Sequence, residues 1–541
     1  MTFGAEVNAQ RLLVSGGPIL TLDSLAPRPE AMVVENGRVL ALGERQRLEA
    51  HLGGSASRLD LAGRAVVPGF TDSHLHLLSY GLMLDQVQLA GVSSLVEMAA
   101  RLREGLGRLP DDAWVVGRGW DQDRLAERRY PTRQDLDAAV GSRPALLTRA
   151  CGHCSVANSR ALEFAGITAA TSDPAGGLIE RDPATGEPTG ILHETAAHLV
   201  RRVMPPSSPE MMQRGLQRAL ELALSKGLVA CHPDDVRTGG DFATVWNLYA
   251  QLLPKLGGPR IRMDVSDFEM QTLIERGLRS GSGDARLSVG AIKTFVDGSL
   301  GARSAALTRP YNDGPGAGIL VQERGDFLRT VREAHRHALQ VAVHAIGDLA
   351  IDWALDAIEA AQTELPGQHL RHRIVHAQIT RPDQLPRFWS QDVVADIQPK
   401  FVTTDKLWVE ERVGRDRACH SYCWASMIRS GVACAGGSDG PVEPLDPLLG
   451  VFAAVTRQGL DCEPVEGWLP GERLTLVEAL RLFACGGAHA AGSEAWRGSL
   501  TPGHAADFVV LDRCPENVDP REIKDLAVVA TYIDGRQVYG A

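Results

Sequence analysis

Two histidines separated by one residue, His74 and His76, are the first candidates for chemistry in this sequence. They lie in Pro68–Tyr80, which follows the apolar run Ala65–Val67 and predicts a strand that ends in a turn at Gly81. In a strand, side chains two positions apart point the same way, so the two imidazoles would sit side by side. Such a pair is half of a binding site for zinc or a similar divalent cation. An HxH spacing also arises by chance, so a polar strand end without a ligand is the alternative.

A second HxH, formed by His335 and His337, lies in Asp326–Leu339, where the apolar residues have helical spacing. On a helix, residues two positions apart point in nearly opposite directions, so this pair is not arranged to hold one ion. We therefore predict that both of these histidines are solvated.

The middle of the chain predicts the elements that would position the first pair. The 541 residues are too many for one ordinary domain, and contents of 44% hydrophobic and 23% charged residues are typical of a globular protein. Apolar strands alternate with helical patterns, which is typical of a parallel sheet built from βα units, and eight such strands close a TIM-type α/β barrel. The eight candidate strands are Val66–His76, Leu228–Pro233, Ile261–Ser266, Val289–Val296, Val341–His344, Arg373–His376, Val393–Gln398 and Val432–Gly437.

The two ends of the chain carry a different pattern. Residues 1–65 and 490–541 show short apolar runs separated by hairpin signals such as Glu35–Arg38. Neither segment is long enough for a core of its own, so we expect one composite β-sandwich beside a barrel of residues 66–489. Residues 82–226, between strands one and two, far exceed a usual loop and contain their own helix and strand patterns, which predicts an inserted cap over the barrel mouth.

Active sites of such barrels lie at the carboxyl ends of the strands, and ionisable residues recur there. These residues are His74 and His76 in strand one, Lys293 in strand four, His344 in strand five, His376 in strand six and Asp439 after strand eight. Lys293 stands among apolar neighbours, where a lone ammonium would carry a large desolvation cost. It either pairs with a carboxylate such as Asp297 or Asp439, or its amine has reacted with CO2 to form a carbamate that can bridge two metals. A snorkelling lysine at a strand end is the third alternative.

The net charge and the distribution of apolar residues indicate which classes of partner to expect for this chain. The formal net charge is −11, with the acids spread along the chain, whereas a nucleic-acid-binding protein needs a basic face. No run of about 18 apolar residues predicts a membrane span, and Met1–Val14 lacks the basic and apolar regions of a signal peptide. Nine scattered cysteines are typical of reduced thiols. We therefore expect a cytoplasmic protein that acts on a small molecule, without a nucleic-acid or membrane partner, and a homodimer is an open alternative to a monomer.

At these residues the chain resembles the amidohydrolase superfamily, and within it the amidohydrolase-3 (YtcJ-like) metal-dependent hydrolases, which include N-substituted formamide deformylases. The resemblance covers almost the whole chain and is specific for the superfamily and the subgroup, but it is weak for the substrate. The matching segments are Pro68–His76, Gly119–Gln122, Asn158–Leu162, Lys293–Ser299, Val343–Asp348, Val375–Gln378, Gly437–Val442 and Gly498–Asp512. The segment Ala484–Ala488 departs from the family's usual Thr-containing segment, which affects the expected packing there and not the chemistry.

The resemblance implies a (β/α)8 barrel with a composite β-sandwich and a site for one or two divalent metal ions, with zinc as the expected ion. It implies six site residues, which are His74 and His76 as ligands of the more buried metal, Lys293 as a bridging carbamate, His344 and His376 as ligands of the second metal, and Asp439 as metal ligand and general base.

Six further side chains are candidates for the substrate pocket. Four of them lie in the predicted cap, where tryptophans are nevertheless most often core residues. The candidates are Trp120 and Asp121 in the predicted cap, His153 and Asn158 by resemblance, and Arg417 and Tyr422 in the connection between strands seven and eight.

These features predict hydrolysis of a C–N amide-type bond, in an N-acyl or N-formyl amine, by a metal-activated hydroxide. Asp439 would take the proton from water and pass it to the leaving amine. A mononuclear deaminase and an ester or lactone hydrolase of the same superfamily are alternatives, and a catalytically idle scaffold is another. Those deaminases carry a glutamate in an HxxE pattern after the strand-five histidine, whereas His344–Asp348 reads HAIGD, which disfavours deamination.

Overall fold

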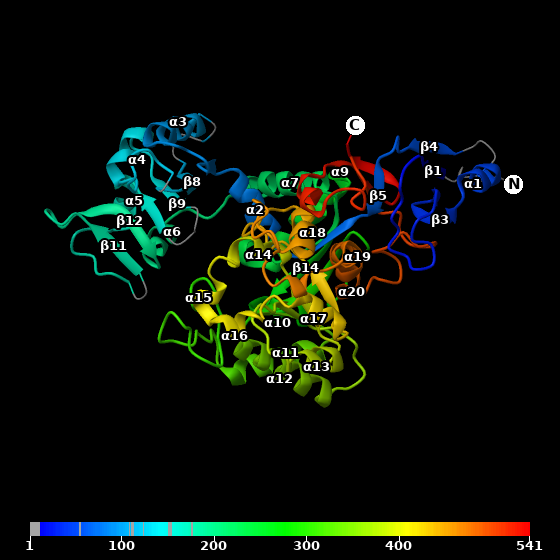
Figure 1. Ribbon diagram of the computed structural model, residues 1–541. Helices are drawn as coiled ribbons and strands as arrows, with labels where there is room; N and C mark the ends of the chain where they lie inside the picture. The colour runs from blue at the N-terminus through cyan, green and yellow to red at the C-terminus, as the bar shows by residue number, and fades with distance from the viewer. Residues whose placement is uncertain are drawn as a thin grey trace. The chain divides into compact units, whose positions relative to one another are not determined.

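The computed structural model describes residues 11–52, 56–107, 109, 113–122, 124–149, 154–174 and 177–540. The chain divides into two compact units, and Figure 1 follows it through both by colour. The first unit joins Met1–Tyr80 to Gln217–Ala541 and contains a barrel and a pair of smaller sheets. The second unit, Gly81–Leu216, contains one mixed sheet with helices.

An eight-stranded parallel sheet with the order β19-β18-β17-β16-β15-β14-β13-β6 forms the barrel. Every neighbouring pair in this order is parallel, and each predicted strand overlaps an observed one, so the predicted TIM-type α/β barrel is confirmed. The strands are β6 (Phe70–Leu75), β13 (Leu228–Pro233), β14 (Arg260–Ser266), β15 (Leu287–Phe295), β16 (Val341–Ala345), β17 (Arg373–His376), β18 (Val394–Ile397) and β19 (Cys434–Gly436).

The two edge strands of the barrel, β6 and β19, are joined just beyond their ends. The backbone N–H of Asp439 donates to His74 O at 2.8 Å, and that of His76 donates to Gly440 O at 2.7 Å. Gly437 permits this approach, because a Cβ there would lie 2.8 Å from His74 N. These bonds bring the sheet close to closure, and they hold the backbone of three predicted site residues.

Segments near both chain ends form two four-stranded sheets with the orders β3-β2-β1-β4 and β22-β21-β20-β5. Figure 1 shows the blue and red ends of the ribbon together in this region. The two sheets share one apolar core, which includes Val14, Met32, Val66, Phe508 and Val510. The strands are β1 (Arg11–Ser15), β2 (Ala31–Glu35), β3 (Arg38–Gly43), β4 (Ser57–Asp60), β5 (Ala65–Pro68), β20 (Phe508–Leu511), β21 (Val528–Ile533) and β22 (Arg536–Tyr539).

The predicted first strand, Val66–His76, is two strands in the structure. β5 pairs antiparallel with β20, whereas β6 enters the barrel. Gly69 lies between them, at a place where a Cβ would come within 2.5 Å of Val229. The chain therefore crosses from one sheet to the other at a residue without a side chain, and His76 falls just past the end of β6.

Helices of the first unit lie between and around these strands, and α2 and α7 cross the boundary between the two units. Within the described ranges, no helix combines the length and the apolar character needed to cross a membrane. The helices are α1 (Arg45–Leu52), α2 (Leu77–Leu84), α7 (Pro209–Ser225), α8 (Val236–Gly239), α9 (Phe242–Leu256), α10 (Met270–Glu275), α11 (Arg324–Arg336), α12 (Asp348–Glu364), α13 (Leu385–Ser390), α14 (Val402–Asp405), α15 (Val409–Val413), α16 (Arg415–Ala418), α17 (Trp424–Arg429), α18 (Pro447–Thr456), α19 (Leu476–Arg481) and α20 (Gly487–Ala490), with 3-10 turns η1 (Asp267–Glu269), η2 (Pro399–Phe401), η3 (Pro470–Glu472) and η5 (Pro520–Asp525) and the π-helix η4 (Leu482–Gly486).

The position of His335 corrects one sequence prediction. α11 buries Phe327, Val331 and His335, which recur every four residues along one face, while His337 is exposed. His335 is 1% exposed, and its Nδ1 lies 2.9 Å from Nε2 of His372. The predicted solvated pair is wrong for His335, because residues two apart on a helix face opposite sides and one of them can enter the core.

A buried ion network crosses the interior of the barrel. Arg373 on β17 donates to Asp264 of β14 at 2.9 Å and to Asp396 of β18 at 2.5 Å, and all three side chains are fully buried. The same guanidinium donates to Ser73 O at 2.5 Å, next to His74. A buried guanidinium requires such compensation, and here the compensation also supports the strand that carries the first histidine.

The second unit has a six-stranded sheet with the order β11-β12-β10-β9-β8-β7 and its own apolar core, which includes Val115, Trp120 and Leu147. It overlaps the insertion predicted for residues 82–226 but ends at Leu216, and the role of that insertion as a cap over the barrel mouth stays a prediction. Its elements are β7 (Val87–Gln88), α3 (Leu95–Leu106), β8 (Val115–Trp120), α4 (Arg133–Val140), β9 (Ala145–Arg149), β10 (Cys154–Ala157), α5 (Ser159–Phe164), β11 (Gly177–Arg181), β12 (Pro188–Glu194) and α6 (Ala196–Arg201).

Candidate metal centre

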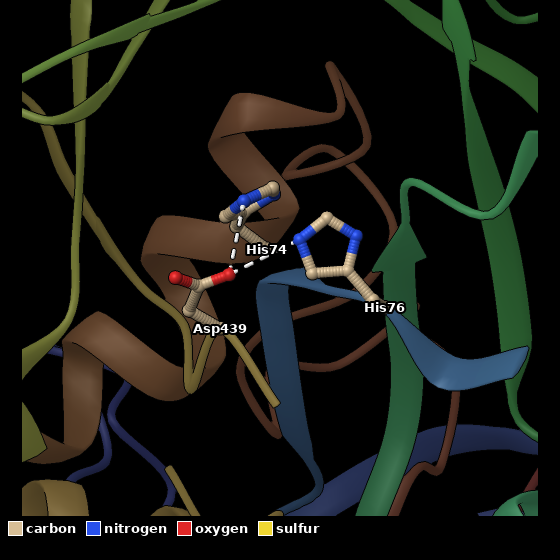
Figure 2. Close-up of side chains that lie close together, drawn as sticks. All are labelled: His74, His76 and Asp439. Carbon is tan, nitrogen blue, oxygen red and sulfur yellow. Dashed lines mark ion pairs between the residues drawn. The ribbon is translucent and has the colours of Figure 1, made fainter. Parts of the chain in front are cut away.

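His74, His76 and Asp439 meet where β6 ends and the loop after β19 begins, as Figure 2 shows. Asp439 Oδ1 lies 3.5 Å from His74 Nε2 and 3.2 Å from His76 Nε2. One ligand atom of each residue lies within 4.8 Å of the other two. Donor atoms that are about 2.0–2.2 Å from one tetrahedral ion lie roughly 3.3 Å apart, so this spacing fits a single cation.

Hydrogen bonds determine which nitrogen of two imidazoles is free. His76 Nδ1 lies 2.8 Å from Asp234 O, and His376 Nδ1 lies 2.7 Å from Gln398 Oε1. Only an N–H can satisfy these acceptors, so in the neutral rings Nε2 carries the lone pair. That is the form in which imidazole binds a metal ion.

In this cluster, His76 and Asp439 each shift the pKa of the other. Burial alone lowers the pKa of His76, but the hydrogen bond and the charge of Asp439 raise it to about 9. Burial alone raises the pKa of Asp439, but the hydrogen bond from His76 and the neighbouring positive charges lower it below its usual range. A proton therefore lies between Nε2 and Oδ1 when no cation is bound, and a cation that binds there must displace it.

His344 and His376 form a second pair beside the first. Their ring centroids lie 4.5 Å apart, and the His376 ring lies 5.7 Å from that of His74. His344 Nε2 lies 3.2 Å from Gly298 O, which leaves Nδ1 as the free nitrogen of the neutral ring. His376 has a φ of 78°, a left-handed conformation that a histidine adopts rarely and that is frequent at functional sites.

Lys293 is 0% exposed near the end of β15, and its Nζ lies 3.2 Å from His74 Nε2. No carboxylate oxygen in the described part of the chain lies within 4.0 Å of Nζ, so the ion pair considered with Asp297 or Asp439 does not form. Complete burial also rules out a snorkelling lysine. Burial lowers the pKa of the Lys293 amine, which increases the fraction of neutral amine.

Three polar residues that were not predicted as site residues hold the histidines. Asp234 follows β13 and Gln398 follows β18, so both stand at carboxyl ends of barrel strands. Asp297 accepts three backbone N–H hydrogen bonds and lies 3.6 Å from His344 Nε2. The strand-end position was a signal available in the sequence for all three, but only coordinates connect each residue to its histidine.

A cavity of about 460 Å³ opens beside this group, lined by Arg237, Asp267, Phe295, Asp297, Val321 and Gln322. Phe295 connects it to the histidines, because its ring centroid lies 5.2 Å from that of His344 and 4.9 Å from Lys293 Nζ. The guanidinium of Arg237 lies 5.0 Å from the same ring and donates to Asp267 at 3.1 Å. The wall of the cavity thus combines an aromatic face with an oriented charge.

The predicted pocket residues of the second unit that the structure describes form hydrogen bonds or ion pairs within that unit. His153 lies outside the described residues. Trp120 is 0% exposed in the core of that unit, and its Nε1 donates to a backbone carbonyl at 3.3 Å. Asn158 is 0% exposed and caps α5, and Asp121 pairs with Arg149 at 2.8 Å. Trp120 and Asn158 therefore have no free surface for a ligand, and the expectation that they line a pocket is corrected.

Arg417 and Tyr422, predicted for the other wall, are also buried, at 9% and 1% exposed. Arg417 donates to three backbone carbonyls at 2.6–2.9 Å. The hydroxyl of Tyr422 donates to Asp405 at 2.7 Å and accepts from Gln378 at 2.6 Å, two residues after His376. Both side chains therefore hold loops in place. Tyr422 has almost no free surface for a ligand, whereas a pocket role of Arg417 stays a prediction.

Comparison with known proteins gives a consistent result. A family model described as "Amidohydrolase family" matches residues 58–539. The putative amidohydrolase YtcJ of Bacillus subtilis is 36% identical over 528 residues, which covers 97% of this chain and 98% of that protein. The N-substituted formamide deformylase of Arthrobacter pascens is 30% identical over 546 residues, which covers 97% of each chain. A solved structure, an uncharacterized metal-dependent hydrolase from Pyrococcus horikoshii, is 32% identical with a TM-score of 0.78 and covers 94% of this chain and 99% of its own.

Proposed function

The chain belongs to the amidohydrolase family, and we propose that it is a metal-dependent hydrolase that cleaves a C–N amide-type bond other than a peptide bond, in an N-acyl or N-formyl amine. The observation that carries the proposal is the convergence of His74, His76 and Asp439 within 4.8 Å. Lys293 adds to it, because its buried amine reaches His74 with no carboxylate partner within 4.0 Å in the described chain. The relative named N-substituted formamide deformylase supports an N-formyl amine as substrate.

The residues present fit a divalent cation. Imidazole nitrogens and a carboxylate oxygen at tetrahedral spacing are typical of zinc, which we propose as the ion. A bound divalent cation supplies Lewis acidity, which lowers the pKa of water and polarises a carbonyl group. The residues that would hold one ion are His74, His76 and Asp439, and those that would hold a second are His344 and His376 together with Lys293 as a carbamate.

Lys293 suits the bridging role because of its burial. Its lowered pKa provides neutral amine, whose nitrogen attacks CO2, forms an N–C bond and loses a proton to give a carbamate anion. Carboxylation converts a buried cation without an ion-pair partner into an anion that faces cations, and so it removes the desolvation cost of the ammonium.

Asp439 is the proposed carrier of the proton. Its lowered pKa keeps the carboxylate ionised near neutral pH. Oδ1 faces the two histidines, whereas Figure 2 shows Oδ2 turned away from them. Oδ2 takes the proton from the attacking water and delivers it to the leaving nitrogen, which must be protonated because an amide anion is a poor leaving group.

Deamination receives less support from the geometry. The third residue after His344 is Gly347, where the deaminase pattern requires a glutamate. The next residue, Asp348, is 3% exposed, accepts from Thr308 N at 2.9 Å and lies 3.4 Å from an Arg381 nitrogen. The Asp348 carboxylate is thus bound by Thr308 and Arg381 at the start of α12, and it is not available as a second acid beside the histidines.

We also propose a small-molecule substrate and a cytoplasmic location. The cavity of about 460 Å³ beside Phe295 has the size of a small-molecule site. The cysteines of the described ranges are all free thiols, which supports a reducing compartment.

The test is a substrate panel that pairs N-formyl and N-acetyl benzylamines with the matching benzyl esters, lactones and aminopurines. Zinc-loaded and chelator-treated protein are compared for each compound. The proposal expects zinc-dependent release of benzylamine. Cleavage of esters or lactones alone, release of ammonia from an aminopurine, or no turnover by fully metallated protein would each contradict it.

A further inference from the structure

Two guanidiniums at the amino-terminal end of the barrel, which we call the barrel floor, lack a carboxylate partner. Arg497 is 6% exposed, and it donates to Ser493 Oγ at 2.7 Å and to Thr71 Oγ1 at 3.2 Å. Arg262 is partly buried and reaches Gln340 Oε1 only at 3.4 Å. Its Nε is buried and has no hydrogen-bond partner in the described chain. No carboxylate oxygen in the described ranges lies within 4.0 Å of either guanidinium.

His232 lies beside these groups. Ala230 pairs with Thr71 on one side and with Arg260 on the other, so two residues further along β13 His232 comes next to Arg262 on the same face. His232 is 0% exposed, and both of its ring nitrogens lack a hydrogen-bond partner among the residues described. A neutral imidazole has one N–H that donates a hydrogen bond and one nitrogen lone pair that accepts one. A buried ring in which neither hydrogen bond is formed therefore indicates a missing partner.

The shared face is the interior of the barrel. Asp264, two residues after Arg262 on β14, binds Arg373 of β17 at 2.9 Å, although β15 and β16 separate the two strands. The contact must therefore cross the inside of the barrel. This interior face carries His232 and Arg262. It also carries the hydroxyl of Thr71, which accepts the hydrogen bond from Arg497.

The charges around the floor do not balance. Four guanidiniums stand against three buried carboxylates that lie within reach of them, which leaves one positive charge without a counter-ion in contact. The buried carboxylates of Asp72 and Asp234 face Ser438 N and His76 instead. The partly exposed carboxylate of Asp534 is shared with Arg286 and does not close the balance. Burial, followed by the charges of the arginines, lowers the pKa of His232 well below its ordinary value, so the imidazole stays neutral and adds no further positive charge. The groups counted are Arg260, Arg262, Arg373 and Arg497, with Asp264, Asp396 and Asp507.

A cavity lies on the outer side of the residues next to the floor. A cavity of about 650 Å³ is lined in part by Arg38, Arg260, Arg286 and Trp496. The indole of Trp496 contacts the guanidinium of Arg260 at 5.1 Å and that of Arg497 at 5.9 Å. The cavity is thus separated from Arg497 by the indole of Trp496, and its lining carries three arginines and the carboxylate of Asp534.

We propose that the barrel floor binds one small monovalent inorganic anion, such as chloride, between His232, Arg262 and Arg497. The anion accepts hydrogen bonds from Arg262 Nε–H and from the one N–H of His232, and its charge completes the balance of the floor. A water molecule could accept the same hydrogen bonds, but it would leave the buried positive charge in place. His232 and Arg262 come two residues before Asp234 and Asp264, so the site lies one layer of side chains below the metal centre. The anion contacts none of the proposed metal ligands, so it stabilises the fold and takes no part in hydrolysis.

Bromide tests the site directly, because it replaces chloride and scatters X-rays anomalously. Crystals of the full chain grown without halide are soaked in sodium bromide and measured at the bromine edge. We expect an anomalous peak within hydrogen-bonding distance of Arg262 Nε and a ring nitrogen of His232. The absence of a peak there, with an ordered water in its place, would overturn the proposal.

Thermal unfolding provides a second test in solution. At constant ionic strength, an increase in chloride should raise the unfolding midpoint of the wild-type protein, because a ligand that binds only the folded state stabilises it. Arg262→Met should lose this response. Arg286→Met, which removes a cavity arginine paired with Asp534, should keep it. A chloride response that is absent in the wild type, or equal in the wild type and Arg262→Met, contradicts the proposal, and the bromide experiment decides if Arg262→Met does not fold.

Discussion

Gln398 offers a test of how the imidazoles are oriented, because it contacts a proposed ligand without being one. Its Oε1 lies 2.7 Å from His376 Nδ1, and the two residues are 3% and 4% exposed. Gln398→Leu removes the acceptor and nearly keeps the volume. The N–H of His376 would then be buried without a partner, which costs about 1–3 kcal/mol.

The ring can respond to this loss in two ways. It can keep the unpaired N–H, in which case the cost appears as a lower free energy of unfolding. It can instead move the proton to Nε2, and that nitrogen no longer has a lone pair for a metal ion. Loss of such an outer partner typically lowers metal affinity by about 10- to 100-fold, which corresponds to roughly 1.4–2.7 kcal/mol.

The assay is competition for zinc between the protein and a chromophoric chelator, with urea unfolding measured in parallel. Gln384→Leu is the matched control, because Gln384 is 0% exposed and donates to Asp348 O at 2.7 Å but contacts no proposed ligand. We expect the control to lose stability and to keep its zinc affinity. An unchanged zinc affinity in Gln398→Leu, or an equal loss in both variants, would refute the reasoning.

Three other substitutions test separate parts of the account. Asp439→Asn should lower kcat by roughly 10²- to 10⁴-fold while zinc remains bound, and full activity at equal metal content would show that another group moves the proton. Lys293→Ala should lose metal in elemental analysis, and retention of both ions at normal affinity would exclude the bridge. Burial and the neighbouring His335 lower the pKa of His372 to about 3, so its neutral form stabilises the fold fully above its ordinary pKa of 6.5 and less as the pH falls toward 3. His372→Gln should therefore flatten the pH dependence of unfolding in that window by up to about 1.4 kcal/mol per pH unit, and a profile parallel to the wild type would contradict this assignment.

The barrel could be predicted from the sequence because each strand is a short apolar run bounded by turn signals. Leu228–Pro233 and Arg373–His376 have the same bounds as β13 and β17. The HxH pair was visible for the same local reason, since its period of two matches a strand. Local pattern could not reveal that Gly69 divides the first strand between two sheets, because that division depends on contact with Val229.

Side chains whose role depends on distant partners were harder to predict. His335 had a signal in the sequence, because Phe327, Val331 and His335 share one helical face, but its partner His372 lies on another element. Trp120 was considered for a pocket and is a core residue, which its apolar ring made the more common outcome. In each case the missing information was which residues meet across the fold.

The central claim is that residues far apart in the sequence converge on metal ions at the carboxyl end of the barrel. Anomalous diffraction at the zinc edge from crystals of the zinc-loaded protein tests it most directly. The account predicts one peak within about 2.0–2.2 Å of a nitrogen of His74, a nitrogen of His76 and an oxygen of Asp439, and a second peak between His344 and His376 with carbamate density on Lys293. A zinc peak at another place on the chain, or no peak between His74 and Asp439 in fully loaded crystals, would contradict it.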